Sequence, residues 1–381
     1  MRGAIRKAFT LMKGIIKTKH RKSNSKNILF VLPGGLGDAV LFYEHLIRLI
    51  DYCQKERYGL KVLCGKSAKY MYINMLGIDM DYFTKNSEIP HSIDSRYKII
   101  EEIGNEEFDY VIGSNDDVVI SNVLANHKIA VLSNSEYRTI IWPHRILYKI
   151  IFDRIITVSD SMWIVDRYNT ILADVFGISM KVRVPSLKKM DIKTDEKYIV
   201  ISVDSSLQMR QWPLNNFCEL ICRLHHTYCL DIVVTGKSRE QEDVFEPLNF
   251  VRDLRGKTSL EELFWFINNS LFVVGVDSGN IHIAAALGVQ SFVLVAQHER
   301  GKFFPYSPEL KDENLPEPIC IASSIDYACS GCLMRKRNMK KGNIKCYQQC
   351  FLKQGCVKCL ESISVLDVMV KIEEYMQYKN K

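Results

Sequence analysis

The sequence has no run of about 18 uncharged apolar residues, the length that a membrane-spanning helix needs, so we expect no transmembrane helix. The apolar core and small-residue cleavage site of a secretory signal peptide are also missing from the N-terminus. We therefore expect a cytoplasmic protein. At 381 residues with 47% hydrophobic content, the chain is long for a single core, which favours two globular domains.

Acidic residues are absent from residues 1–26, which hold nine Lys or Arg, so the rest of the chain carries −2 of the net +7. Apolar residues recur in this leader at helical spacing, and basic residues surround them: Ile5, Phe9, Met12 and Ile16, with Arg6, Lys7, Lys13 and Lys17. This pattern predicts a short helix on an anionic bilayer surface. A solvated, disordered tail fits the same residues, and nucleic-acid binding is a third interpretation, weakened by the lack of an aromatic stacking platform.

Two common nucleotide-binding motifs are incomplete. Gly-Lys-Ser or Gly-Lys-Thr begins at Gly65, Gly236 and Gly256, but the glycine that a P-loop requires five positions earlier is missing each time. Residues 33–38 lack the full G-x-G-x-x-G, and their acid lies inside the turn, which argues against a nicotinamide site.

From Asn27 the chain alternates short β-branched runs with helical stretches, the pattern of parallel sheets covered on both faces. In the first half we expect strands at 28–32, 61–64, 110–113, 129–132 and 154–158, and helices at 40–57 and 161–176. In the second half we expect strands at 198–203, 231–235 and 271–276, and helices at 214–227, 239–247, 259–269 and 280–287.

Pro185 and many charges interrupt this alternation and indicate a linker. The predicted organisation is a basic amphipathic leader (1–26), a first domain (27–180), a linker (181–197), a second domain (198–325), and a cysteine-rich tail with a C-terminal helix (326–381). The fold class is α/β, with two doubly wound domains. Ligands in such folds bind outside the carboxyl ends of the strands, so we expect the motifs of both halves to face one cleft.

Residues 271–288 pass from an apolar run through small polar residues into an alanine-rich helix. Asp277, Ser278 and Gly279 would lie at a strand's carboxyl end, where the unpaired N–H groups of a helix start suit a phosphate. Ser278 can cap the helix, and Gly279 lets a ligand approach the backbone. Asp277 should face hydroxyls or a sugar ring, and simple helix capping is the alternative. We expect His282 to contact phosphate or sugar, against the alternative of a histidine satisfied in packing.

Other loops follow the predicted strands of the second half. Arg210 can neutralise a diphosphate, although an Arg beside Trp212 is often only a stacked surface pair. Trp212 itself is expected in the core. Ser205 and Ser206 share the Arg210 loop and can donate hydrogen bonds, and Glu240 or Glu242 can hold a ribose or simply favour a helix N-terminus. A helix start is expected with Thr258 or Ser259 as cap and Glu261 or Glu262 completing the capping box.

Four blocks, in this order and spacing, resemble the bacterial heptosyltransferase family (glycosyltransferase family 9), whose members build the lipopolysaccharide core: residues 35–41, 210–214, 253–263 and 277–288. The resemblance extends over residues 27–370 and includes a cysteine-bearing tail. It implies the GT-B fold, with the acceptor on the first domain and the nucleotide-sugar donor on the second.

The resemblance also implies residue roles. Asp38, within the acceptor-side loop of Gly34, Gly35 and Gly37, matches the proposed catalytic base, with a helix cap as the alternative. Arg210 stands where the family usually has lysine, and either cation can stabilise a diphosphate leaving group. The loop that contains Lys257 and Thr258 would lie beside the donor.

Asp79-Met80-Asp81 matches the Asp-x-Asp motif with which sugar transferases of another fold hold a divalent metal, but it lies away from the donor motifs. We expect inversion by a single in-line displacement, with no cofactor required for catalysis. A structural zinc is expected at Cys329, Cys332, Cys356 and Cys359, with Cys346 and Cys350 as substitutes, because paired C-x-x-C spacing indicates zinc and cytosolic thiols stay reduced.

The expected activity is transfer of heptose, or a related sugar, from an ADP-sugar to a lipopolysaccharide core acceptor at the inner face of the inner membrane. No nucleic acid is expected as a partner. Alternatives are a nucleotide-sugar epimerase or another GT-B enzyme, and a non-catalytic zinc- or nucleic-acid-binding protein. Acceptor recognition is expected in the loops at 85–102 and 134–149.

Overall fold

The computed structural model divides the chain into two compact units, Met1–Lys181 and Val182–Lys381. The structure describes residues 10–14, 23–32, 34–85, 93–104, 106–114, 117–140, 142–180, 185–187, 196–207, 210–237, 244–297, 301–307, 315–325 and 357–379. Within these ranges, no helix is both long enough and apolar enough to cross a bilayer.

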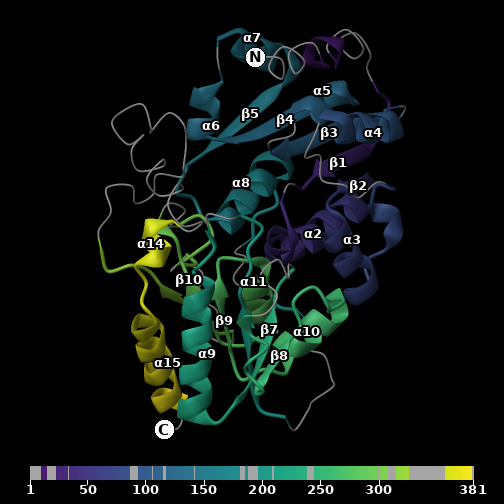
Figure 1. Cartoon of the computed structure of the whole chain (residues 1–381). Helices are drawn as coiled ribbons and strands as arrows, with labels where there is room; N and C mark the ends of the chain where they lie inside the picture. Colours follow the sequence, from purple (N-terminus) through teal and green to yellow (C-terminus); the bar gives the residue numbers. More distant parts are fainter. Residues whose placement is uncertain are drawn as a thin grey trace. The chain divides into compact units, whose positions relative to one another are not determined.

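The first unit contains a five-stranded parallel sheet in the order β2-β1-β3-β4-β5 (Figure 1). Its strands are β1 (Asn27–Val31), β2 (Gly59–Leu63), β3 (Glu107–Ser114), β4 (Leu124–Ser133) and β5 (Arg154–Val158). Its helices are α2 (Leu36–Glu56), α3 (Lys66–Tyr70), η1 (Met71–Met75), η2 (Met80–Tyr82), α4 (Ile93–Ile103), α5 (Asp117–Asn122), α6 (Asn134–Thr139), α7 (Trp142–Ile151) and α8 (Ile164–Phe176).

β1 is buried on both faces, as its apolar sequence predicts. Phe30 stacks on Phe42 of α2 at 4.9 Å, and Phe42 in turn meets Tyr168 of α8. Leu29 and Val31 point to the opposite face, where they join a core cluster with residues of α4, α5 and α7. The alternation therefore places helices on both sides of the sheet.

The second unit contains a six-stranded parallel sheet in the order β11-β10-β9-β6-β7-β8. Its strands are β6 (Tyr198–Ser202), β7 (Asp231–Thr235), β8 (Val251–Asp253), β9 (Val273–Val276), β10 (Ser291–Leu294) and β11 (Ile319–Ile321). Its helices are α9 (Leu214–Tyr228), α10 (Leu260–Asn268), α11 (Gly279–Ala286), α14 (Lys358–Glu361) and α15 (Val365–Lys379).

α9 and α15 lie side by side on one face of this sheet (Figure 1). Ile199 and Ile201 of β6 pack with apolar residues of both helices in one core cluster. The other residues of β6 face α10 and α11, since Tyr198 donates to the main-chain oxygen of Phe266 and Ser202 accepts from Asn280. The chain thus has the predicted α/β class, with two parallel-sheet units.

The predicted helix at 239–247 is wrong where the structure describes it. Residues 244–247 form a turn, in which Phe245 is 1% exposed and anchors the chain in the core. The helical conformation is disfavoured for a residue that precedes a proline, and Glu246 precedes Pro247 here. The remainder of that predicted helix, including Glu240 and Glu242, lies outside the described residues.

Part of the basic leader belongs to the first unit. Residues 10–14 form a helical turn in which Leu11 is fully buried in the same core cluster as α7. Thr10 pairs with Tyr97 of α4 at 2.8 Å, and a Cβ added to Gly14 would meet the main-chain oxygen of Ser121 at 2.5 Å. Met12, which belongs to the apolar face predicted to lie on a bilayer surface, is 50% exposed, whereas Leu11 is buried. At these positions the leader is packed on the domain rather than solvated.

Candidate functional site

The donor-side motifs lie at the topological switch point of the second sheet. β6 lies between β9 and β7, and the chain runs from β6 towards β7 and β8 but from β9 towards β10 and β11. The loops that follow β6 and β9 therefore leave in opposite directions, and ligands in open α/β sheets bind at such a point. The β6 loop carries Ser205 and Arg210, and the β9 loop carries Asp277 and Ser278.

These two loops are bonded to each other. The Ser205 hydroxyl donates to the main-chain oxygen of Asp277 at 2.9 Å, and Arg210 Nη1 lies 3.3 Å from Asp277 Oδ1. Both charged side chains are buried, with Arg210 9% and Asp277 5% exposed. Asp277 thus faces Arg210, whereas the sequence suggested a sugar ring. Ser206, in the same loop, is exposed.

The cation of Arg210 lies 5.1 Å from the centre of the Phe303 ring, in the segment after β10. Trp212 is not its stacking partner, because Trp212 is 3% exposed and donates from Nε1 to the main-chain oxygen of Ile363 at 3.1 Å. The expectation of a core tryptophan is confirmed, and the alternative of an Arg–Trp surface pair is wrong.

Ser278 occupies the N-cap position of α11, but its side chain makes no capping bond. Its Oγ is buried and has no hydrogen-bond partner among the described residues. The expected capping bond is therefore absent, although the position is the predicted one. A buried hydroxyl without a partner loses about 1–3 kcal/mol relative to a paired one, and a ligand atom can satisfy it. Gly279 is the first residue of α11, where N–H groups lack intrahelical partners.

His282 is held by aromatic residues. It is 3% exposed, its Nδ1 lies 2.7 Å from Tyr306 Oη, and its ring stacks on Phe304 at 4.6 Å. Burial, aided by the charge of Arg210, lowers the pKa of His282 to about 3, so the ring is neutral at physiological pH. Burial chiefly raises the pKa of Tyr306, well above its usual value. This geometry matches the alternative of a histidine satisfied in packing.

The loops after β7 and β8 are held by carboxylates. Asp204, beyond β6, accepts from the main-chain N–H of Lys237 at 2.8 Å, and a Cβ on Gly236 would meet its Oδ2 at 2.6 Å. Arg255 is 2% exposed and binds Asp253 with two nitrogens, each at 2.9 Å. Both loops thus have fixed backbones at the same edge of the sheet.

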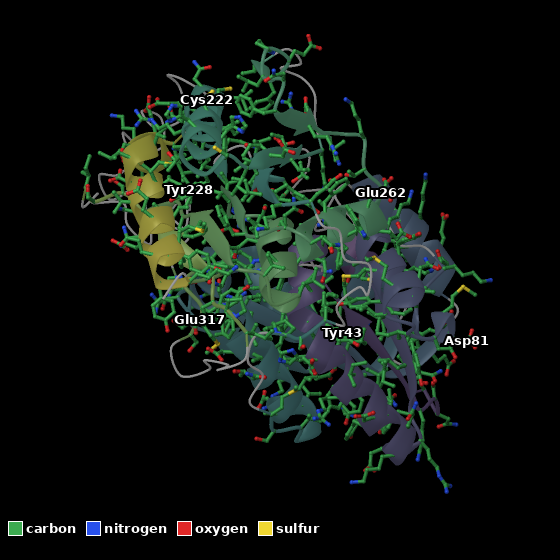
Figure 2. The ribbon with its side chains drawn as sticks, turned by 90° about the horizontal axis from the view of Figure 1, so that it is seen from below. Tyr43, Asp81, Cys222, Tyr228, Glu262 and Glu317 are labelled. Carbon is green, nitrogen blue, oxygen red and sulfur yellow. The ribbon has the colours of Figure 1, made fainter. Side chains whose placement is uncertain are left out.

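Lys257 is exposed, and its Nζ donates to the main-chain oxygen of Asp253 at 3.0 Å, while Thr258 is half-buried. The predicted capping box is confirmed with Ser259 and Glu262: the Ser259 hydroxyl accepts from the Glu262 N–H at 3.2 Å, and the Glu262 carboxylate accepts from the Ser259 N–H at 2.7 Å. Glu262 marks this start of α10 in Figure 2.

The first unit has the same kind of switch point, between β1 and β3. The loop after β1 carries Gly34, Gly35 and, in the first turn of α2, Asp38 and Gly37. Asp38 Oδ2 accepts from the Gly35 N–H at 3.1 Å. This is the contact expected of a helix cap, the alternative to a catalytic base. Gly34 has φ +106°, and a Cβ there would collide with the Asp38 carboxylate. Only glycine fits at this position.

Side-chain hydrogen bonds hold the first half of α2 in place. Tyr72 donates to the main-chain oxygen of Ala39 at 2.6 Å, and His45 pairs with Asn169 of α8 at 2.8 Å. Burial, with a contribution from the Asp38 charge, raises the pKa values of Tyr72 and Tyr168 well above the usual range. Asp38 is therefore a half-buried carboxylate on a rigid helix end.

The predicted metal motifs are placed only in part. Asp79 accepts from the N–H of Asp81 at 2.9 Å and so caps η2, and exposed Asp81 is visible in Figure 2. In the described residues, no three His, Cys, Asp or Glu side chains gather as metal ligands would. Of the predicted zinc ligands, only Cys359 is described, and it is buried in the core; Cys329, Cys332 and Cys356, with the substitutes Cys346 and Cys350, lie outside the described residues.

Sequence reasoning missed several contacts that shape the donor-side edge. Tyr306 and the two phenylalanines before Pro305 surround His282. The aromatic run at 303–306 was the sequence signal that could have revealed this contact. Asn280, which donates to Ser202 Oγ at 2.9 Å, ties α11 to β6. Asp204 had no sequence signal, because its partner is a backbone group 33 residues away.

Three solved structures share this architecture. The chain is similar to ADP-heptose lipopolysaccharide heptosyltransferase II of E. coli (TM-score 0.59, 15% identity, 93% of this chain and 100% of that one). It is also similar to E. coli heptosyltransferase WaaC with ADP-2-deoxy-2-fluoro heptose (0.57, 16%, 92% and 99%) and to the family 9 glycosyltransferase of Veillonella parvula DSM 2008 (0.57, 15%, 91% and 96%). These likenesses show the GT-B fold.

No curated protein sequence gives a significant match. The model of glycosyltransferase family 9 (heptosyltransferase) matches residues 96–320, more than half of the chain. This match contains the Arg210 and Asp277 loops, while Asp38 precedes it. The chain therefore belongs to glycosyltransferase family 9, the heptosyltransferases.

Proposed function

We propose that this glycosyltransferase moves heptose, or a closely related sugar, from an ADP-linked donor to a lipopolysaccharide core acceptor, with inversion at the anomeric carbon. Membership of family 9 supports sugar transfer. The ADP-heptose analogue held by the similar E. coli WaaC supports the choice of donor. The observation that carries the proposal is the junction of the β6 and β9 loops, where a buried arginine, a helix start and an unpartnered hydroxyl occur together.

The donor diphosphate is assigned to Arg210, Ser278 and the Gly279 N–H. A diphosphate accepts hydrogen bonds from all three groups, and it replaces the partner that Ser278 Oγ lacks. Asp277 holds Arg210 in a buried position and orients the cation. Arg210 has five N–H donors in a planar fork that suits phosphate oxygens, and Nη1 is directed at Asp277.

The remaining donor-side residues take supporting roles. Ser205 and Ser206 lie in the Arg210 loop, and Ser205 fixes the backbone of Asp277. Lys257 and Thr258 lie in the loop after β8, and Glu240 follows β7 in the sequence, where it is assigned to the ribose. His282 acts as a positioning residue, because its Nδ1 is committed to Tyr306.

Asp38 is assigned as the base. The acceptor hydroxyl oxygen forms a bond to the anomeric carbon as the bond from that carbon to the diphosphate oxygen breaks, ADP leaves with the electron pair, and Asp38 takes the hydroxyl proton. The Gly35 N–H fixes one carboxylate oxygen of Asp38. The carboxylate accepts the proton in this proposal.

The proposal requires no metal ion for catalysis. Charge on the departing diphosphate is balanced by Arg210 and by the partial positive charge at the start of α11. The lipid-linked acceptor places the reaction at the cytoplasmic face of the inner membrane, and the nine cations of residues 1–26 favour such an anionic surface.

The test is product mass. We would incubate the protein with ADP-heptose and a panel of truncated lipopolysaccharide acceptors, with EDTA and without added divalent metal. We expect an acceptor that gains one heptose, loss of this product in Asp38→Ala, and normal activity in Asp81→Ala, an exposed acid of the same unit. Transfer from GDP- or UDP-sugars but not from ADP-heptose would refute the donor assignment.

A further inference from the structure

Two segments far apart in the sequence expose apolar side chains from one region of the first unit. Met12 is 50% exposed, Ile146 44% and Ile150 46%. Residues 10–14 and α7 share a core cluster through Leu11, Tyr148 and Ile151, so both segments cover the same face of the sheet. Figure 1 shows α7 and the short N-terminal helical turn at the same end of this unit.

The outer side of α7 is a continuous stripe. Ile146, Lys149 and Ile150 have the i, i+3, i+4 spacing of one helix face, and all three are exposed. Tyr148 and Ile151 point the other way, into the core. The same division occurs in residues 10–14, where Thr10, Leu11 and Gly14 are buried while Met12 and Lys13 are exposed. Each segment is anchored from below and presents apolar and basic side chains outward.

The charged side chains carried by these two segments have one sign. α7 contains Arg145 and Lys149 and no acid, and residues 1–26 contain nine cations and no acid. α15, in the second unit, provides the contrast. Its Leu366 and Val370 are 63% and 41% exposed at the same i, i+4 spacing, but that helix carries charges of both signs: Asp367, Glu373 and Glu374 with Lys371 and Lys379. Apolar side chains accompanied only by cations suit an anionic bilayer better than apolar side chains accompanied by acids and lysines together.

We propose that residues 10–14 and α7 form the surface with which this protein lies on an anionic lipid bilayer. Met12, Ile146 and Ile150 insert at the level of the lipid headgroups and acyl boundary, while Lys13 and Lys149 contact the headgroups. The packed Leu11 fixes residues 10–14 on the domain, so these residues and the α7 stripe act as one surface. This inference rests on the proposed function, which supplies a lipid-anchored acceptor.

The test is co-sedimentation of the full-length protein with phosphatidylglycerol/phosphatidylcholine vesicles and with pure phosphatidylcholine vesicles. We expect binding to the anionic vesicles only, reduced by added salt. The double variant Ile146→Ser/Ile150→Ser should bind about tenfold more weakly, since it loses two inserted side chains. The matched variant Leu366→Ser/Val370→Ser should bind like the wild type.

The proposed bilayer-binding surface would be refuted by no binding of the wild type to anionic vesicles, by unchanged binding of the α7 double variant, or by an equal loss of binding in the α15 control. Light scattering tests whether a second copy of the chain covers this surface instead. A dimer that is abolished by Ile146→Ser/Ile150→Ser, while vesicle binding persists, would also refute the proposal that the surface binds a bilayer. Heptose transfer to a soluble, delipidated acceptor separates the two proposals. If that transfer fails in the wild type while vesicle binding follows the predicted pattern, the proposed function is wrong and the surface stands.

Discussion

Arg210 and Asp277, from the loops after β6 and β9, form a buried ion pair with 3.3 Å between Nη1 and Oδ1. The pair joins two loops that leave the sheet in opposite directions. Removing one partner of a buried pair leaves the other charge uncompensated, which makes this contact sensitive to substitution. It also holds in place the cation that we assign to the donor diphosphate.

Arg210→Ala should lower the free energy of unfolding by about 3–5 kcal/mol and reduce kcat by about 100-fold or more, because buried Asp277 loses the cation paired with it and the diphosphate loses its cation. Urea denaturation and steady-state kinetics measure the two effects. Arg223→Ala is the control, since its exposed pair with Glu219 contributes only about 0.5 kcal/mol. A stability loss no larger than that of the control would contradict the buried pair.

Ser278→Ala should leave the stability of the free protein unchanged or slightly raise it, because the variant removes a buried hydroxyl that has no partner among the described residues. The same change should weaken ADP binding by about tenfold, the effect of one lost hydrogen bond to a charged group. Calorimetric titration with ADP and thermal unfolding of the free protein separate these effects. A loss of stability together with unchanged ADP affinity would show that Ser278 is only structural.

Gly34→Ala should abolish most of the transfer activity, since a Cβ at φ +106° is strained and collides with the Asp38 carboxylate. Gly35→Ala is a matched control one residue away, where φ is −95° and a Cβ meets nothing within 4 Å. ADP affinity should be unchanged in both variants, because the donor loops belong to the second unit. Equal activity of the two variants would argue against a fixed geometry at Asp38.

Acid should destabilise the protein through its buried histidines. The pKa of His282 is lowered to about 3 and that of His45 to about 4, chiefly by burial, so the unfolded chain binds their protons more tightly. Stability is therefore full above the ordinary pKa of 6.5 and falls as pH drops towards these values, by up to about 1.4 kcal/mol per pH unit for each ring.

Unfolding free energies between pH 4 and 7 measure this dependence. His282→Gln should show a shallower slope than the wild type, because glutamine does not titrate. A wild-type slope in His282→Gln would contradict a neutral, buried ring.

The strands and their carboxyl-end loops were predictable because β1, β6 and β9 are short apolar runs followed by small polar residues. Local spacing also gave the Ser259–Glu262 capping box. The contacts of Asp277 and His282 were not predictable, since their partners lie 67 and 24 residues away in the chain. No local pattern distinguishes a carboxylate that binds a sugar from one that holds an arginine.

The leader shows a second limit. Its helical spacing grouped Met12 with other apolar residues on a face directed at a bilayer but gave no role to Leu11, which fills the core between α4, α5 and α7. Sequence periodicity gives the faces of a helix only when the helix spans several turns, and the described turn has five residues. Tertiary packing therefore decided which side is buried.

A crystal structure of this protein with bound ADP would test the central claim most directly. The account predicts diphosphate oxygens within hydrogen-bond distance of Arg210, Ser278 Oγ and the Gly279 N–H, with the Arg210–Asp277 pair retained. A diphosphate bound elsewhere in the chain, with Ser278 Oγ still without a partner, would contradict it.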